Sequence, residues 1–590
     1  MEITRVFDIL DYLKQHPKSD ILAAKVNKRW QTYTTDDFAN NANKVGAALL
    51  HLGLQPGDKA ALLAGNSPQW NFVDFGAQQV NMPTAPIFPT INNDDLLYIL
   101  NHSEAKIVFV SDRGGLQKIN VLKDKLPHLK HVVSFSKQDG CMHFDEFLAL
   151  GEKHLDLAKI ESIKKSVKPN DLFTLLYTSG TTGQPKGVML SHNNMLSNVK
   201  ICKDIAPFTP KWRALSFLPL NHVYERFLNS LYLYNEVSIY YAENFETIGE
   251  NCREIHPQLF VAVPRILEKV LEKICAAGEK LSGPKRKIFD WSLDLAERFE
   301  YKGANGWWYE LQRKIADKLV YKKWREAVGG EIVIIVSGGA ALNPRLERIF
   351  YCAGLNLLQG YGLTETCVVV AVNRIDEERR MFGTVGMVVE NSEVKIAEED
   401  GEILVKGPSV MLGYYKNPEA TAEVIDKDGW FHTGDVGKMV DGKFLKITDR
   451  KKEIFKNSAG KYISPVLIEN KLKECKYIEQ CMVIGENQKF VSAFIVPSIP
   501  AFKEHLASRK IAPASHEELA NHEMLKQLIQ DHVKKINATL APYEQVKRQQ
   551  LVFEHWTIEN GEITPKLSLR RKVILQKHQE VYHKIFLNED

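Results

Sequence analysis

The sequence has few cysteines and no long hydrophobic run, and each absence narrows the class of protein. Its 8 cysteines form no CxxC pair and no cluster of metal ligands, which argues against a zinc site or a disulfide framework. We expect reduced thiols and a cytoplasmic location. No window reaches the roughly 18 consecutive apolar residues that a spanning helix needs, and the first residues do not resemble a signal peptide. Any membrane contact is therefore expected to be peripheral, at the inner face.

The chain also lacks a strong charge of either sign. Its formal net charge of +4 argues against a dedicated nucleic-acid binder. The hydrophobic content of 44% and the charged content of 25% are ordinary for a globular protein. A length of 590 residues exceeds what one hydrophobic core usually supports. We therefore expect a large body and at least one further domain.

Short apolar segments alternate with helical patterns in the first part of the chain. The pattern predicts a helix over 38–52 and strands over 59–63 and 106–110. Three prolines within residues 81–90 exclude a helix there and predict an extended segment. Such alternation favours the α/β class, with a large layered N-terminal body of mostly parallel sheets.

Residues 177–192, YTSGTTGQPKGVMLSH, follow an apolar run at 172–176 that predicts a buried strand. Glycines let backbone amides approach an anion, hydroxyls add donors and Lys186 adds a movable charge, so the loop suits a polyphosphate. The P-loop pattern GxxxxGK[ST] does not fit, because Pro185 precedes the lysine. A polar surface turn is the simplest alternative.

Taken whole, this stretch resembles the signature of the AMP-forming, adenylate-making superfamily of acyl-CoA synthetases, nonribosomal-peptide adenylation domains and beetle luciferases. The segment LNHVYERF at 220–227 resembles the His-x-x-Glu-Arg form of long-chain acyl-CoA synthetases. By that resemblance His222 orients the acyl carboxylate, whereas a lone histidine is more often structural. Arg226 stands where some relatives carry a gating tryptophan. The resemblance spans about 33–572.

The resemblance also implies a nucleotide pocket. EIVIIVSGGAAL at 331–342 and LLQGYGLTETC at 357–367 match the segments around adenine, and the TGD of DGWFHTGD ends at the ribose acceptor Asp435. Glu365 would bind Mg²⁺ with help from a hydroxyl of the first loop, with Thr178 and Thr181 as alternatives. The implied metal ligands are Glu365 and Thr178. The implied cofactor-binding residues are Thr178, Ser179, Gly180, Thr181, Thr182, Lys186, Gly338, Gly339, Ala340, Gly360, Tyr361, Gly362, Thr364, Asp435, Arg450 and Gly460.

Residues 441–465 read as a junction between two domains. We predict an N-terminal adenylate-forming domain over 1–448 and a small mobile α+β domain over 449–590. The resemblance places Arg450 at the ribose, Asp449 near the hinge, and Gly460 where the pantetheine thiol approaches. NGEITPKLSLRRK at 560–572 matches the catalytic-lysine motif and points to Lys566. The implied catalytic set is Lys566, His222, Glu365 and Arg450.

A helical region within the first domain, at about 276–330, carries more basic than acidic residues and several tryptophans. Such a face is usually solvated surface over an ordinary core. The resemblance adds that long-chain members have an extended helical segment here. The alternative hypothesis is that the basic side, which bears tryptophans, touches an anionic membrane.

Together these residues predict a ligase that activates a long-chain fatty acid with ATP to acyl-AMP and then transfers the acyl group to coenzyme A. ATP, Mg²⁺ and coenzyme A are the implied cofactors, and no nucleic-acid partner is expected. Two alternatives stay open at this point: an acyl-AMP ligase that loads a carrier protein, and a catalytically silent lipid- or nucleotide-binding homologue. The preferred chain length and the oligomeric state also stay open.

Overall fold

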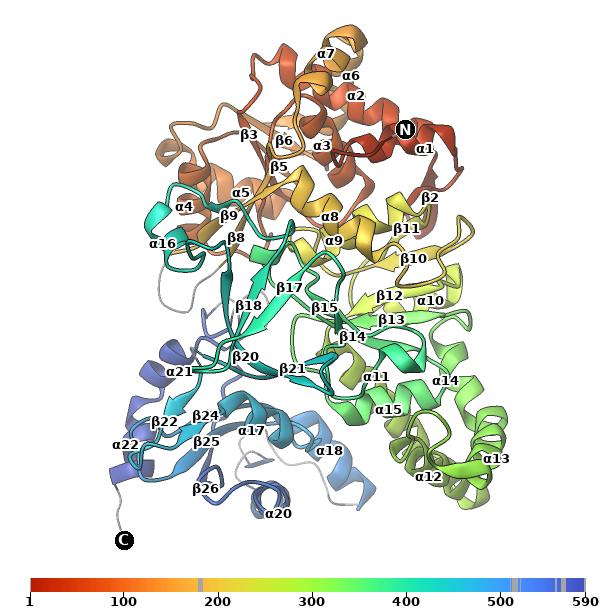
Figure 1. The fold of residues 1–590 in the computed structure, drawn as a ribbon, viewed down its shortest axis with the longest axis vertical. Helices are drawn as coiled ribbons and strands as arrows, with labels where there is room; N and C mark the ends of the chain where they lie inside the picture. Colours follow the sequence, from red (N-terminus) through yellow and green to blue (C-terminus); the bar gives the residue numbers. More distant parts are fainter. Residues whose placement is uncertain are drawn as a thin grey trace. The chain divides into compact units, whose positions relative to one another are not determined.

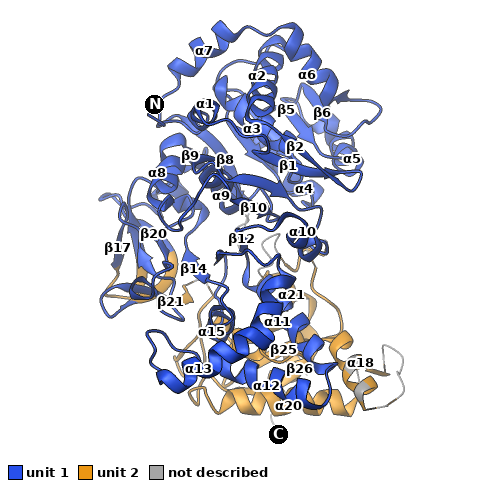
Figure 2. Ribbon diagram, turned by 90° about the vertical axis from the view of Figure 1, so that its right-hand side faces the viewer, with its two compact units in different colours: residues 1–395, 404–433, 439–446 blue, residues 396–403, 434–438, 447–590 orange. Residues whose placement is uncertain are grey.

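The computed structural model describes residues 2–178, 184–451, 453–509, 511, 518–519, 522–557, 560–563 and 569–587. The chain divides into two compact units, coloured separately in Figure 2. Unit 1 comprises residues 1–395, 404–433 and 439–446, and unit 2 comprises residues 396–403, 434–438 and 447–590. The predicted fold class, a large α/β body with a smaller C-terminal α+β part, is confirmed. The mobility of the smaller part stays a prediction.

The first sheet of unit 1 contains the strands that end at the predicted nucleotide and histidine motifs. In spatial order its strands include β14 (Leu357–Tyr361), β13 (Ile334–Ser337), β12 (Leu259–Ala262), β10 (Arg213–Ser216), β11 (Ser238–Tyr241), β1 (Leu22–Val26) and β2 (Arg29–Tyr33). From β14 to β1 neighbouring strands are parallel. Beyond β14, β15 (Ala371–Val372) and β16 (Met387–Val388) pair antiparallel.

The second sheet of unit 1 contains the strand that leads into the predicted phosphate loop. In spatial order its strands are β19 (Gly413–Tyr414), β9 (Lys186–Ser191), β8 (Leu172–Thr178), β4 (Thr84–Pro86), β3 (Lys59–Leu63), β5 (Ala105–Val110), β6 (His131–Ser134) and β7 (Met142–His143). From β8 to β7 the pairing is parallel. The strands predicted at 59–63, 106–110 and 172–176 and the extended proline segment are confirmed.

Helices cover both faces of this second sheet (Figure 1). Ile107 and Phe109 of β5 lie in one core with residues of α2, α3 and α6, while Val108 and Val110 lie in another core with residues of α4 and α5. This alternation is the two-residue period of a strand buried on both sides.

The helices of unit 1 are α1 (Asp8–Gln15), α2 (Thr35–His51), α3 (Pro68–Gln79), α4 (Asn93–Ser103), α5 (Arg113–Leu122), α6 (Phe144–Lys153), α7 (Leu157–Ser166), α8 (His192–Cys202), α9 (Val223–Tyr234), α10 (Ile248–Ile255), α11 (Pro264–Glu279), α12 (Gly283–Glu297), α13 (Gly306–Ala316), α14 (Lys322–Ala327), α15 (Pro344–Cys352) and α16 (Pro418–Ala422). The helix predicted over 38–52 begins earlier, at Thr35, because Thr34 and Asp37 form a capping box. Within the described ranges, no helix combines the length and the apolar character needed to span a bilayer.

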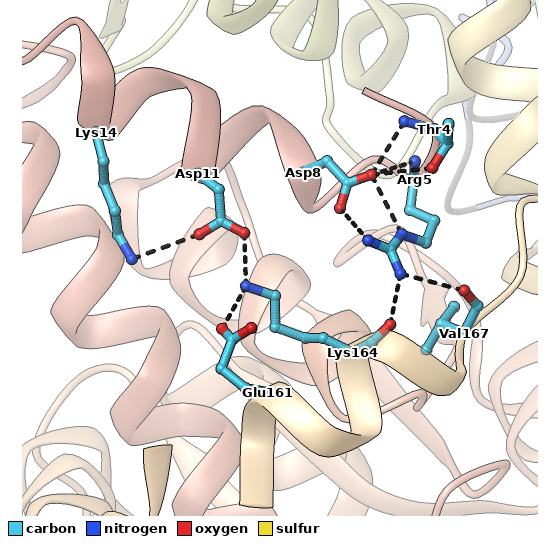
Figure 3. A network of polar contacts seen from close by, with 8 residues as sticks. All are labelled: Thr4, Arg5, Asp8, Asp11, Lys14, Glu161, Lys164 and Val167. Atoms are coloured by element: carbon cyan, nitrogen blue, oxygen red, sulfur yellow. Dashed lines mark hydrogen bonds and ion pairs between the residues drawn. The ribbon is translucent and has the colours of Figure 1, made fainter. Parts of the chain in front are cut away.

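The start of the chain is fastened to the helix that precedes β8 (Figure 3). The guanidinium of Arg5 forms an ion pair with Asp8 at 2.8 Å and donates to the carbonyl of Lys164 at 2.6 Å. The ammonium of Lys164 forms ion pairs with Asp11 at 2.6 Å and Glu161 at 2.7 Å. Because Lys164 lies in α7, these contacts fix the segment that leads to the phosphate loop.

Unit 2 is built on a three-stranded sheet in which β24 (Ile478–Ile484) pairs antiparallel with β25 (Val491–Pro497), and β25 pairs parallel with β26 (Val546–Leu551). Cys481 and Val483 face a core that includes residues of α17 (Pro465–Leu472) and α20 (Glu523–Asn537). Met482 and Ile484 face a second core. The side chains of β24 therefore alternate between two cores. The remaining named elements of unit 2 are β22 (Phe455–Lys456), β23 (Tyr462–Ile463), α18 (Ile499–Ser508), α21 (Arg571–Lys577) and α22 (Gln579–Leu587).

The division between the units passes through several strands rather than through one linker. β18 (Glu402–Lys406), β20 (Phe431–Val440) and β21 (Phe444–Arg450) each contain residues of both units. β17 (Glu393–Ile396) reaches the same division.

Candidate functional site

Three loops that carry predicted site residues leave the first sheet of unit 1 at the carboxyl ends of its strands. β10, β12, β13 and β14 are parallel, with Ser337 of β13 opposite Gln359 of β14. Residues 217–222, 338–340 and 361–365 follow these strands and therefore lie along the same edge. The carboxyl ends of parallel strands are where α/β sheets bind ligands. The structure thus brings the predicted glycine segments and the histidine motif to one side of the sheet.

Packing requires a glycine at position 362, and the neighbouring predicted glycines Gly338 and Gly339 suit their own positions. A Cβ on Gly362 would lie 1.1 Å from the carbonyl oxygen of Val368, so no other residue fits without a backbone shift. A Cβ on Gly338 would lie 3.1 Å from the hydroxyl oxygen of Tyr224, which belongs to the histidine motif. Gly339 has φ +80°, a left-handed conformation that favours glycine. Gly338 therefore lets the end of β13 approach the start of α9.

His222 lies at the N-cap of α9, where its Nδ1 accepts a hydrogen bond from the amide of Tyr224 at 3.1 Å. The loop before it is tied to the loop after β3 by Asn66. The side chain of Asn66 donates to the carbonyl of Leu218 at 2.7 Å and accepts from the amide of Leu220 at 2.8 Å. Because β3 and β10 belong to different sheets, Asn66 joins the two sheets directly beside His222.

Asn221 makes the reciprocal connection. Its side chain donates to the carbonyl of Ala64 at 2.9 Å and accepts from the indole of Trp70 at 3.1 Å. Asn221 and Trp70 are buried, so these bonds form away from water, where an unpaired partner is costly. The sequence motifs did not indicate a role for Asn66, Trp70 or Asn221. The only signal for Asn221 was its place directly before His222.

Arg226 stands where some relatives carry a gating tryptophan. In this structure its buried side chain bonds α9 to α3 and to the second sheet. Its side chain is 2% exposed and forms an ion pair with Asp74 of α3 at 2.5 Å. It also donates to the hydroxyls of Thr84 at 2.8 Å and Thr174 at 2.6 Å. Thr174 lies in β8, so the helix that begins after His222 is bonded to the strand that leads into the phosphate loop.

Glu225, the neighbour of Arg226, is also buried. Its carboxylate accepts hydrogen bonds from the hydroxyl of Ser216 at 2.5 Å and from the side chain of Asn229 at 3.4 Å. Burial raises the pKa of Glu225 to about 8, although the bond from Ser216 acts in the opposite direction. In the folded protein the carboxyl group of Glu225 is therefore mainly protonated at neutral pH.

The phosphate-loop lysine and the predicted metal carboxylate meet at one tyrosine. Thr178 pairs with Lys186 across the β8–β9 hairpin, while the predicted Ser179, Gly180, Thr181 and Thr182 lie outside the described residues. The Nζ of Lys186 is 4.8 Å from the ring centroid of Tyr414. The hydroxyl of Tyr414 donates to Glu365 at 3.1 Å. Tyr414 was missed, and its place directly after Gly413 in the run GYYKNPEAT was the available signal.

Two asparagines of α8, one helical turn apart, position the turn that carries Glu365 and a neighbouring loop. Asn198 donates to the carbonyls of residues 366 and 367 at 3.2 and 2.7 Å. Asn194 donates to the carbonyls of residues 408 and 410 at 2.8 and 2.9 Å. Because α8 follows β9 directly, the hairpin with Lys186 and the turn with Glu365 are linked. Thr364, also predicted, is buried in that turn.

A magnesium ion would find a suitable but incomplete set of ligands at Glu365. In the part of the chain that the structure describes, no three His, Cys, Asp or Glu side chains group as a metal site. Mg²⁺ is commonly bound by one or two carboxylates with the remaining positions taken by phosphate oxygens and water. One carboxylate that shares the neighbour Tyr414 with the lysine predicted to bind phosphate fits that pattern.

The predicted ribose ligands lie together within unit 2. The Nε of Arg450 is 2.9 Å from Asp435, whose side chain is 5% exposed while that of Arg450 is 52% exposed. The preceding Gly434 has φ +71° and donates its amide to Glu402 at 2.8 Å. A buried carboxylate next to an accessible guanidinium offers both acceptor and donor groups to a diol.

Gly460 lies at the tip of a turn between β22 and β23. It has φ +74°, and a Cβ on it would have no neighbour within 4 Å. The side chain of Asn457 closes the turn by accepting from the amides of Ala459 and Lys461 at 3.1 and 2.9 Å. Lys451, also in this region of unit 2, forms ion pairs with Asp400 and Glu402.

Lys566 lies outside the described residues, but the structure describes both flanks of its segment. Ile563 and Leu569 form an antiparallel bridge, and the amide of Arg570 donates to the carbonyl of Glu562 at 2.8 Å. The carboxylate of Glu562 forms an ion pair with Lys577 of α21 at 2.7 Å. The two described flanks of the segment with Lys566 therefore lie next to each other in unit 2.

A buried ion pair fixes the C-terminal flank of that segment. The guanidinium of Arg571 forms two hydrogen bonds with the carboxylate of Glu469, at 2.7 and 2.8 Å. Glu469 is 3% exposed and lies in α17. Arg571 also lies 3.6 Å from Glu453, close to the predicted hinge. These residues were not predicted, because the resemblance named only the lysine.

Comparison with known protein families identifies the family of the chain. Residues 11–415 match the AMP-binding enzyme family, and residues 453–590 match the AMP-binding enzyme C-terminal domain. The chain belongs to the AMP-binding enzyme family. The resemblance to the AMP-forming superfamily, predicted from residues 177–192 and the later motifs, is thereby confirmed.

Relatives of this family match over almost the whole chain. The long-chain-fatty-acid–CoA ligase FadD15 of Mycobacterium bovis is 30% identical, covering 98% of this chain and 96% of that protein. The human long-chain-fatty-acid–CoA ligase 1 is 30% identical, covering 92% of this chain and 80% of that protein. The solved adenylation domain of a Mycobacterium chelonae carboxylate reductase has a TM-score of 0.76 at 21% identity, covering 99% of this chain and 91% of that one. That structure shows the shared fold alone.

Proposed function

We propose that this protein is a long-chain-fatty-acid–CoA ligase that forms acyl-AMP from a fatty acid and ATP and then passes the acyl group to coenzyme A. The observation that carries the proposal is the junction of Lys186 and Glu365 around Tyr414. The same unit carries the His222 loop at the carboxyl edge of its first sheet. The names of the relatives support the substrate class and the acceptor.

In the first step the fatty acid carboxylate attacks the α-phosphorus of ATP, and the bond to pyrophosphate breaks. Lys186 and the loop after Thr178 bind the triphosphate, and His222 orients the carboxylate. Mg²⁺ bound at Glu365 would neutralise phosphate charge. Lys566 stabilises the charge that develops as pyrophosphate leaves. The residues thus bind, orient and neutralise, and the enzyme forms no covalent bond to the substrate.

In the second step the thiol of coenzyme A attacks the acyl-AMP carbonyl, the thiol proton is lost and AMP leaves. Asp435 and Arg450 bind the ribose, and Gly460 gives the pantetheine arm room to approach. The two steps need different groups, Lys566 first and Gly460 second. We therefore propose a mobile domain over 449–590 that presents them in turn.

Pyrophosphate release with ATP and Mg²⁺ over fatty acids from acetate to oleate, with and without coenzyme A, tests the proposal. We expect release to be greatest with long chains and to turn over only when coenzyme A is present. Acyl-AMP that accumulates without thioester would favour carrier loading, and no release with any acid would favour a silent homologue.

The proposed substrate dissolves in lipid. We therefore also propose that the enzyme works in peripheral contact with the inner face of a membrane.

A further inference from the structure

A row of large apolar side chains is exposed on the helical insert of unit 1. α13, the π-helical turn η2 (Asp317–Tyr321) and α14 follow one another without a break. At four-residue spacing along this helix, Trp307 is 78%, Leu311 44%, Ile315 46% and Leu319 45% exposed, and Trp308 beside them is 59% exposed. Isolated exposed apolar residues are ordinary, but a contiguous group indicates an interaction surface.

The opposite side of the same helix is firmly packed. The hydroxyl of Tyr309 donates to the carbonyl of Leu295 at 2.6 Å, and that of Tyr321 donates to the carbonyl of Ser292 at 2.7 Å. The helix is therefore fixed against α12, with its apolar row turned outward.

The π-helical turn keeps the row in line. On a regular α-helix, residues four apart advance steadily around the axis. A π turn contains more residues than an α turn, so four residues cover less than one full turn. Leu319 therefore stays close to the face of Leu311 and Ile315 instead of rotating away.

A row of lysines runs beside the apolar row. Lys314, Lys318 and Lys322 each follow an apolar member by three residues, so they are its neighbours on the helix surface. All three are exposed, as is Lys323, and the described residues form no ion pair with any of these four lysines. The acidic side chains of α13 and η2 are instead paired, Glu310 with Arg313 and Asp317 with Arg325.

We infer that this surface lies on an anionic lipid bilayer, with the helix parallel to the membrane plane. We call it the insert face: Trp307, Trp308, Leu311, Lys314, Ile315, Lys318, Leu319, Lys322 and Lys323. Tryptophan prefers the headgroup region, the aliphatic residues enter the acyl boundary, and the lysines reach anionic headgroups. A second copy of the chain docked by two-fold symmetry with the two helices antiparallel would oppose one lysine row to the other, which is repulsive.

The benefit of such contact rests on the proposed function, because a bilayer stores long-chain fatty acid. The binding itself does not depend on ligase activity. It is measured by co-sedimentation of the full chain with vesicles in the absence of ATP and coenzyme A, so that binding and catalysis can fail separately.

Vesicles of phosphatidylcholine, alone or mixed with phosphatidylglycerol, distinguish the apolar and charged contributions. Two triple variants remove one row each: W307S/W308S/L311S and K314Q/K318Q/K322Q. A matched control, L157S/K159Q/K165Q, changes one exposed leucine and two exposed lysines on α7, which lies far from α13 within unit 1 (Figure 1). Chromatography reports the oligomeric state of each variant.

We expect wild-type protein to bind the anionic vesicles, less so at high salt, and each row variant to lose about tenfold in partitioning. The control should bind like wild type, and all variants should keep their activity on a detergent-dispersed fatty acid. Binding that ignores phosphatidylglycerol, or row variants that bind like wild type, would overturn the inference. A dimer that the row variants convert to monomer would also overturn it and assign the face to a second copy.

Discussion

The segments around His222 and Lys566 carry the two proposed catalytic motifs, and they are held in different ways. The His222 loop is bonded on both sides, by Asn66 and Asn221, to a loop of the second sheet, and Arg226 adds a buried contact with β8. The described flanks of the Lys566 segment are joined by the bridge between Ile563 and Leu569, and Arg571 beyond them is bonded to Glu469. The residue proposed to orient the acyl carboxylate thus belongs to the larger unit, whereas the proposed catalytic lysine belongs to the smaller one.

The largest effect is expected from removing the side chain of Lys566, and it should be confined to the first half-reaction. Lys566→Ala should lower the rate of acyl-AMP formation by about a thousandfold, because it removes charge stabilisation as pyrophosphate leaves. Transfer of supplied acyl-AMP to coenzyme A should change little. Single-turnover measurements of each half-reaction check this, with the exposed Lys572→Ala as the matched control. Equal losses in both half-reactions would contradict the assignment.

The next largest effect is expected when the bonds of Arg226 between α9 and the second sheet are removed. Arg226→Met leaves the Asp74 carboxylate buried without its partner and should lower the free energy of unfolding by about 3–5 kcal/mol. The double variant R226M/D74L should recover part of that loss, because no unpaired charge remains. Urea unfolding of all three proteins tests this. A double variant less stable than R226M would contradict it.

Asn221→Ala sharpens the comparison, because it should displace His222 while α9 stays in place. We expect kcat/KM for the fatty acid to fall by about tenfold or more, since small misplacements of a positioning group are costly. The KM for ATP should change little. Steady-state kinetics with each substrate varied in turn measure both quantities, and Asn40→Ala, at an exposed position of α2, is the control. A fall confined to the ATP parameters would argue against a positioning role.

Removing the ion pair between Glu469 and Arg571, which we call the clamp of unit 2, should have a moderate effect. Glu469→Gln removes the charge that pairs with Arg571 and should lower the stability of unit 2 by about 2–3 kcal/mol. Acyl-AMP formation should suffer more than thioester formation, because the clamp supports the segment with Lys566. Limited proteolysis reports the first effect and half-reaction kinetics the second. Equal slowing of both half-reactions would reduce the clamp to a purely structural role.

The smallest effect is a dependence on pH. Burial raises the pKa of Glu225 to about 8 from 4.5, so the folded state binds this proton more tightly than the unfolded chain. Between these values stability should fall as the pH rises, by up to about 1.4 kcal/mol per pH unit from this group. Glu225→Gln cannot ionise and should remove that part of the slope. Urea unfolding at several pH values measures it, and an unchanged slope would contradict the assignment.

The sequence predicted the strands and loops well where the signal was local. The apolar run at 172–176 and the strands at 59–63 and 106–110 were confirmed because strand periodicity and turn residues lie within a few positions of each other. The early start of α2 was missed although its signal, Thr34 with Asp37, is also local. The matched family confirms the resemblance that these motifs suggested.

The supporting contacts of the site could not be predicted. Asn66 and Leu220 are 154 positions apart, and Tyr414 and Glu365 are 49 positions apart. Such bonds depend on which strands become neighbours, and a single sequence does not state this. The grouping of residues 396–403 and 434–438 with the C-terminal segment has the same cause. The roles of the predicted site residues remain predictions.

The close contact at Gly362 limits which positions of the proposed nucleotide pocket can be redesigned. Its missing side chain leaves no space at all beside the carbonyl of Val368, so every substitution there would first report a backbone distortion. Ala340 and Ala341 lie exposed after β13. A mutant library aimed at base selectivity should therefore vary positions 340 and 341 and keep position 362 constant.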